Sequence, residues 1–161
     1  MMNKLGIIEG CTIYHGKDSD DREIVQFTAK FAICTDGMPK NIYGDKHWQR
    51  GTAYYNGGKY LNADKVPYIV VPPFIVSAVD GIIMGAEASA FHLKNGNESD
   101  AIVGEKGPKD KLGEGSIELA RRLGLNPHPN HGGTLEHIVH YTIYVGEPAV
   151  VDGIKYKLQR S

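Results

Sequence analysis

The chain has 161 residues, of which 41% are hydrophobic and 23% are charged, and its formal net charge is −1. This length and composition are typical of one globular domain with its own core, and no apolar run is long enough to span a membrane. The near-neutral balance lacks the clusters of lysine and arginine with which proteins bind nucleic acids or membrane surfaces. We therefore expect a monomeric protein with a single domain over residues 1–161, and neither nucleic acid nor membrane among its partners.

The first elements of the chain are predicted to be strands. Residues 6–16 alternate weakly between apolar and polar side chains and end in a polar cluster, which predicts one strand followed by a surface loop. Residues 24–33 have the clearest period of two in the chain. Five apolar residues share one face there: Val25, Phe27, Ala29, Phe31 and Ile33. The Asp36-Gly37 pair favours a turn, and Pro39 prevents the strand from continuing.

The middle of the chain predicts a loop, a buried strand and a hairpin. Residues 42–61 mix aromatic and polar side chains without a period, so we expect an ordered loop with a short strand around residues 52–55. Residues 66–74 form a β-branched run bounded by prolines, which is typical of a strand buried on both faces at the centre of a fold. Residues 87–104 contain two strand-like runs around a turn at residues 95–97 and predict a hairpin.

The last third of the chain contains the only convincing helix pattern. Residues 114–124 place apolar side chains at helical spacing, and Gly124 is positioned to end the helix in the left-handed conformation. Residues 135–146 alternate as a long strand, and the Asp152-Gly153 pair predicts a turn in a last hairpin. We therefore expect a mainly β (α+β) fold: a single compact β-barrel-like domain with one principal helix near residues 114–124. A double-psi barrel and a closed sandwich are the candidate topologies.

The cysteines and histidines do not predict a specific chemistry. Cys11 and Cys34 lie in strand-like segments, and the sequence leaves open whether they form one disulfide or two buried thiols. His137 and His140 have the spacing of paired metal ligands, but residues three apart on a strand point to opposite faces. We therefore predict no metal site.

Two glutamates follow glycines at the ends of predicted elements. Glu105 ends a strand and Glu114 begins the helix, and rigid scaffolds place functional groups at such positions. A pair of carboxylates across a cleft is what glycoside hydrolysis requires. The alternative is two ordinary charges, because glutamate is favourable in a first helical turn and common in solvated loops. A helix N-terminus also lowers the pKa of a carboxyl group, whereas a general acid needs a raised one.

The polar loop after the second predicted strand has two interpretations of equal weight. Its aromatic and hydrogen-bonding side chains could form subsites for a sugar chain, or its aromatic rings could fill the core beneath an ordinary loop. The residues in question are Asp45, Trp48, Gln49, Thr52, Tyr54 and Tyr55.

The order and spacing of these segments resemble the chitosanases of glycoside hydrolase family 75. The likeness covers residues 31–146. It rests on the polar loop, the strand LNADKVPYIVVP, the Gly-acid-x-Gly-Pro turn at residues 104–108, and the Gly-Glu-x-Ser element at residues 113–116.

The resemblance implies a secreted, cofactor-free hydrolase that cleaves the β-1,4 linkages of chitosan internally, with inversion at the anomeric carbon. It implies that Glu114 is the general acid and Glu105 the general base, since the essential pair of the family lies at these two positions. Asp36 and Asp45 would bind the cationic amino sugars or hold the attacking water. The remaining expected subsite residues are Trp48, Gln49, Thr52 and Tyr54.

Two features depart from that family. Glu105 stands where the family usually has aspartate, and a reacting group misplaced by ~1 Å can cost on the order of a hundredfold in rate. An active variant, a changed substrate and a base supplied by Asp36 or Asp45 therefore stay open. The chain also begins without a signal peptide, so we expect a mature extracellular form or delivery as a phage or effector protein. The alternative functions are a peptidoglycan hydrolase and an inactive carbohydrate-binding relative.

Overall fold

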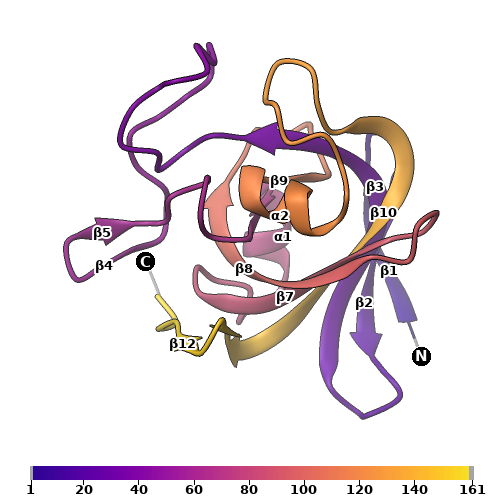
Figure 1. The fold of residues 1–161 in the computed structure, drawn as a ribbon. Coiled ribbons are helices and arrows are strands. Elements are labelled where there is room, and N and C mark those ends of the chain that lie inside the picture. The colour runs from indigo at the N-terminus through magenta and orange to yellow at the C-terminus, as the bar shows by residue number, and fades with distance from the viewer. Residues whose placement is uncertain (1, 160–161) are drawn as a thin grey trace.

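A computed structural model describes residues 2–159, and it is mainly β, with 47% strand and 8% helix. Six strands close into a barrel (Figure 1). In order around the barrel they are β3 (Glu23–Cys34), β10 (Thr134–Pro148), β7 (Ala86–His92), β8 (Glu98–Lys106), β6 (Tyr68–Val71) and β9 (Glu114–Ser116), which pairs back with β3. The expected barrel-like fold is confirmed. Within the described range no helix is long and apolar enough to cross a membrane.

Shorter elements decorate the barrel. A hairpin of β1 (Met2–Ile8) and β2 (Cys11–Lys17) extends the sheet beyond β3. Two small hairpins lie outside the barrel, β4 (Tyr55–Asn56) with β5 (Lys59–Tyr60) and β11 (Val150–Val151) with β12 (Ile154–Lys155). The β4–β5 hairpin projects to the left in Figure 1. The helices are α1 (Pro73–Ala78) and α2 (Ile117–Arg122).

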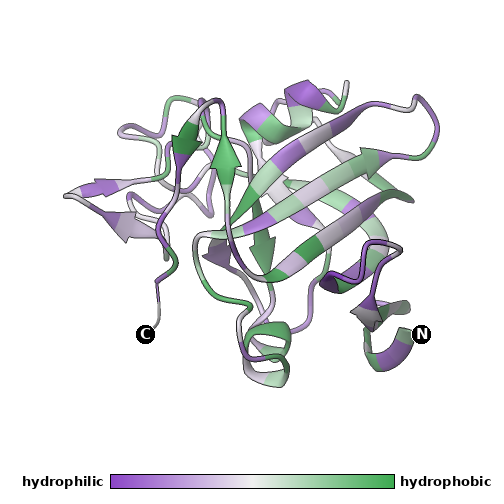
Figure 2. Ribbon diagram, turned by 90° about the horizontal axis from the view of Figure 1, so that it is seen from below, coloured by the Kyte–Doolittle hydropathy of each residue, from purple (hydrophilic) through white to green (hydrophobic). Residues whose placement is uncertain are grey.

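The alternation along the strands builds the core. On β3 the side chains of Val25, Phe27, Ala29 and Phe31 are buried, as predicted, and the ring of Phe27 stacks on Tyr141 of β10 with centroids 4.9 Å apart. Apolar and polar segments alternate along the long strands in Figure 2. All four residues of β6 are buried, which confirms the prediction of a strand covered on both faces. The core residues form one contiguous cluster.

The secondary structure differs from the predicted elements at four places. Residues 6–16 are two strands, because Glu9 and Gly10, with φ of 50° and 75°, form a tight turn between them. The short strand expected around residues 52–55 is β4, which begins at Tyr55. Helix α1 was not predicted, although Pro73 at its first position is a recognised helix start. Glu114 belongs to strand β9, and α2 begins three residues later.

Ser116 joins β9, β6 and α2 through one buried hydroxyl. Its Oγ accepts from the backbone N–H of Leu119 at 3.2 Å and of Tyr68 at 3.1 Å, and donates to the carbonyl of Val66 at 2.7 Å. Replacing Ser116 with alanine removes the helix cap and leaves buried polar groups unpaired. We expect the free energy of unfolding to fall by roughly 2–4 kcal/mol in urea titrations.

The matched control for that variant is Ser77→Ala on the other helix. The Ser77 hydroxyl is exposed and donates only to the carbonyl of Phe74, so we expect a change within about 0.5 kcal/mol. Equal effects of the two substitutions would refute the role assigned to Ser116.

Candidate active site

A cleft of about 860 Å³ lies at the end of the barrel where β3 and β8 end and β9 begins. Its walls come from the end of β3 and the loop that follows, from the turn after β8, from β9 and from the loop before β10. Four carboxylic acids line it: Asp36, Asp45, Glu105 and Glu114. The structure therefore brings both predicted glutamates into one cleft with the two aspartates that were expected to assist them.

Strand β6 sets the separation of Glu105 and Glu114. Val70, in the middle of β6, pairs with Glu105 on one side and with Glu114 on the other, and all three residues line the cleft. Two strand spacings put their Cα atoms roughly 10 Å apart. The two carboxyl groups are thus held on the same face of the sheet, on either side of one strand.

A bulge in β8 directs Glu105 toward the cleft. The register between β6 and β8 shifts at Gly104, which lies unpaired between Val103 and Glu105. A side chain cannot be placed at Gly104, because a Cβ atom would lie 2.6 Å from Cδ1 of Leu61 and 2.9 Å from Cβ of Tyr68. The glycine before Glu105 is therefore a packing requirement of the bulge.

Glu105 is buried and firmly held, with 7% of its surface exposed. Its Oε1 accepts hydrogen bonds from the backbone N–H of Ala53 at 2.8 Å and of Lys106 at 3.0 Å. Its side chain is also hydrogen bonded to that of Asp36. Burial, followed by this hydrogen bond, raises the pKa of Glu105 to about 8.

Asp36 reaches the cleft from the turn that ends β3. Its Oδ1 accepts from the backbone N–H of Gln49 at 2.9 Å, and its own carbonyl accepts from the Tyr68 hydroxyl at 2.8 Å. Gly37 fixes the turn, since it has a φ of 86° and a Cβ atom there would lie 1.7 Å from the Leu61 carbonyl oxygen. Burial raises the pKa of Asp36, and the hydrogen bond with Glu105 opposes that rise.

Glu114 is half-buried, and burial followed by the charge of Asp36 raises its pKa. The nearby Lys111 and Lys30 oppose that rise. Glu114 precedes the helix cap by two residues, so it lies outside the first helical turn. The expectation that a helix N-terminus lowers its pKa is therefore wrong. Burial is the largest influence on this pKa.

Not all of the expected subsite residues face the cleft. Asp45, Trp48 and Gln49 line it. Asp45 is fixed by the Thr35 hydroxyl, which donates to its Oδ2 at 2.7 Å, and the Trp48 indole donates to the Met38 carbonyl at 3.1 Å.

Thr52 and Tyr54 are buried in the core, so the expectation that they line the cleft is corrected. The Thr52 hydroxyl donates to the Tyr54 carbonyl at 2.7 Å, and the Tyr54 ring packs edge-on against Tyr156 with centroids 5.8 Å apart. Their polar atoms form hydrogen bonds within the loop that carries Ala53, whose backbone N–H binds Glu105.

Sequence reasoning missed the lysines of the cleft. Lys46, Lys106 and Lys111 line it, and none of them forms an ion pair with a residue of the described range. Lys30 also lines the cleft, but Glu9 pairs with it. The lysines are scattered along the sequence without a motif, and only the fold brings them together.

The two cysteines lie apart from each other, and so do the paired histidines His137 and His140. Cys11 and Cys34 are both free and buried; Cys11 contacts Nδ1 of His137 at 3.5 Å, and Cys34 accepts from the Tyr68 hydroxyl at 3.4 Å. His140 instead contacts the Thr28 hydroxyl at 2.9 Å. Among residues 2–159, no group of three or more His, Cys, Asp and Glu side chains could hold a metal ion.

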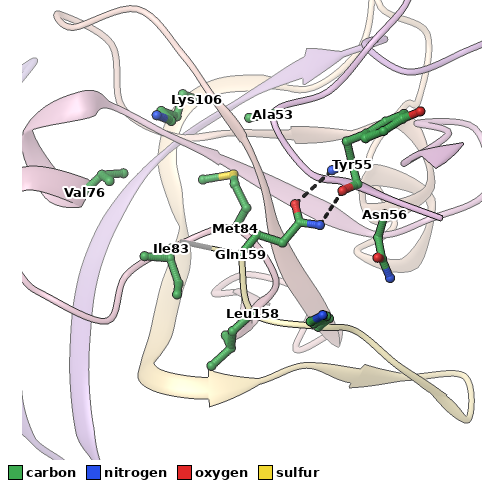
Figure 3. Close-up of a pocket in the computed structure, with 10 residues that line it drawn as sticks. Ala53, Tyr55, Asn56, Val76, Ile83, Met84, Lys106, Leu158 and Gln159 are labelled. Atoms are coloured by element: carbon green, nitrogen blue, oxygen red, sulfur yellow. Dashed lines mark hydrogen bonds between the residues drawn. The ribbon is translucent and has the colours of Figure 1, made fainter. Parts of the chain in front are cut away.

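A smaller pocket of about 540 Å³ lies next to the cleft (Figure 3). Ala53 and Lys106, whose backbone N–H groups hold Glu105, both line it. The Gln159 side chain is already hydrogen bonded to the Tyr55 backbone through both its amide atoms, as the dashed lines in Figure 3 show. None of the described residues that line the pocket carries a carboxyl group.

Comparisons with models of known protein families and with curated proteins find no match to this chain.

Proposed function

We propose that the protein is an inverting endo-glycoside hydrolase that cleaves β-1,4-linked amino-sugar polymers, as the resemblance to chitosanases implies. The observation that carries the proposal is the placement of Glu105 and Glu114 on either side of Val70 in one cleft. Inverting glycosidases separate their two carboxyl groups by ~6.5–9.5 Å, so that a water molecule fits between the base and the sugar. Two strand spacings are compatible with that range.

Glu114 has the environment of a general acid. Burial raises its pKa, which keeps a proton on the carboxyl group at mildly acidic pH, and its partial exposure leaves it open to the glycosidic oxygen. The base that takes a proton from the attacking water is then Glu105 or Asp36, which line the same cleft.

The remainder of the cleft suits an extended chain. Its volume of about 860 Å³ is near the upper end of the ~300–1,000 Å³ typical of ligand sites. Trp48 lines the wall with its indole N–H already bound to Met38, so its orientation is fixed before a sugar stacks on it. Asp45 and Gln49 add polar contacts along the same wall.

A second candidate substrate is the glycan of bacterial cell walls. Three lysines without ion pairs in the described range, Lys46, Lys106 and Lys111, line the cleft. Chitosan carries ammonium groups, which these lysines repel, whereas a cell-wall glycan carries carboxylates, which they attract.

Release of new reducing ends, with chitosan and with purified cell walls as substrates, tests the proposal. New ends from chitosan support the first candidate, and new ends from cell walls alone support the second. Binding to either polymer without new ends, at high enzyme concentration and from pH 4 to 8, would contradict the hydrolase and favour a carbohydrate-binding protein.

A further inference from the structure

Asp36 and Glu105 are two buried carboxylic acids in direct hydrogen-bond contact. Two carboxylates cannot hydrogen bond to each other, because both are acceptors only; the contact requires one proton. The two groups therefore form a pair that carries one proton and one negative charge at neutral pH, and the pair titrates as a unit.

The surroundings of the pair place the shared proton on Glu105. Both backbone donors, Ala53 and Lys106, bind the same oxygen of Glu105, Oε1, which leaves its other oxygen to carry the proton. These two donors favour the charged form of Glu105, but burial and the contact with Asp36 outweigh them. Asp36 is the stronger acid by its ordinary pKa, and the Gln49 N–H also binds it. The pKa of Glu105, raised to about 8, also indicates that Glu105 carries the proton.

We propose that Asp36, and not Glu105, is the carboxylate that activates the attacking water, and that Glu105 is its protonated positioning partner. This inference depends on the proposed glycoside hydrolysis. It assigns the base to one of two acids, Asp36 and Glu105, that line the same cleft as Glu114.

The reaction then balances over the three carboxyl groups. The water oxygen forms a bond to the anomeric carbon while one water proton passes to Asp36. The bond between the anomeric carbon and the glycosidic oxygen breaks, its electron pair stays with that oxygen, and Glu114 supplies the oxygen with a proton. Glu105 keeps its proton throughout. Exchange of one proton each with solvent returns Asp36 to its charged form and Glu114 to its neutral form.

Glutamine is a close substitute for a protonated glutamate at position 105. Its amide oxygen can accept from Ala53 and Lys106, and its amide N–H can donate to Asp36. We expect Glu105→Gln to retain kcat within about tenfold of the parent protein, while Asp36→Asn loses roughly 10²–10⁴-fold, the usual contribution of a general base. Both variants keep the buried hydrogen bonds, so we expect both to fold. Urea titration checks this expectation.

A pH profile separates positioning from a merely structural role. The groups that face Asp36 are Cys34, Asp45, Tyr68, Glu105 and Glu114. Glu105→Ala removes the hydrogen bond that lowers the pKa of Asp36, so the acid limb of kcat/KM should move to higher pH. Glu105→Gln should return that limb to lower pH. An unmoved limb in Glu105→Ala would overturn the positioning role.

Infrared difference spectra test the pair without any activity. In the difference spectrum between the parent protein and Glu105→Gln at pH 7, the carbonyl stretch of one protonated carboxylic acid should be lost, while Glu114 contributes equally to both proteins and cancels. A difference spectrum without that loss, or a Glu105→Gln variant as inactive as Glu114→Gln while Asp36→Asn works, would overturn the inference. A parent protein that shows the expected band but cleaves no polymer would instead contradict the proposed function.

Discussion

Replacing Glu114 with glutamine is expected to lower kcat by roughly 10²–10⁴-fold while leaving polymer binding near that of the parent protein. Glutamine keeps the shape of the side chain but has no proton to give to the leaving oxygen. The loss should therefore appear in kcat rather than in the dissociation constant. Initial rates of reducing-end release and equilibrium binding to the same polymer measure the two quantities.

Glu98→Gln is the matched control for that variant. Glu98 is an exposed glutamate at the start of β8, outside the cleft, so the same change of charge should leave both quantities unaltered. A Glu114→Gln variant with rates close to those of Glu98→Gln would show that Glu114 is not the acid.

The stability of the parent protein is expected to fall with rising pH relative to Glu105→Gln. The pKa of Glu105 is about 8 in the folded state and about 4.3 in an unfolded chain. The folded state therefore binds the proton more tightly, and the stabilisation it provides is fully present below about pH 4 and is lost as the pH rises through 8. The difference in free energy of unfolding between the two proteins should change by roughly 3–5 kcal/mol between pH 4 and pH 8.

Comparison with the glutamine variant isolates the Asp36–Glu105 pair from the other titrating groups. The raised pKa of Glu114 makes stability fall with rising pH, and the pKa of His140, which burial lowers, makes stability rise with pH. Both of these groups remain in both proteins. Urea titrations at intervals from pH 4 to 9 measure the difference, and parallel curves would mean that Glu105 is not protonated in the folded protein.

The strands were predictable where one face is buried, because burial imposes the period of two. β3 shows this best, since Val25, Phe27, Ala29 and Phe31 all enter the core as expected. The segment around Glu114 was not predictable, because the sequence GEGS has no period and continues directly into helical spacing. Only the pairing of β9 with β3 and β6 makes it a strand.

The candidate site was predictable in part. Glu105 and Glu114 could be identified from the glycines before them and from the resemblance, but their placement on either side of Val70 depends on strand order, which no local pattern encodes. The contact between Asp36 and Glu105 joins residues 69 positions apart in the sequence. Thr52 and Tyr54 were misplaced because an aromatic, polar loop has the same composition whether its side chains face a ligand or the core.

The anomeric form of the first product tests the central claim most directly. Proton NMR of a fresh digest of a β-1,4-linked oligosaccharide separates the two anomers before they interconvert. An inverting enzyme that cleaves a β linkage should release the α-anomer first. Release of the β-anomer, or no product from either chitosan or cell-wall oligosaccharides, would contradict the mechanism proposed for Glu114 and the Asp36–Glu105 pair.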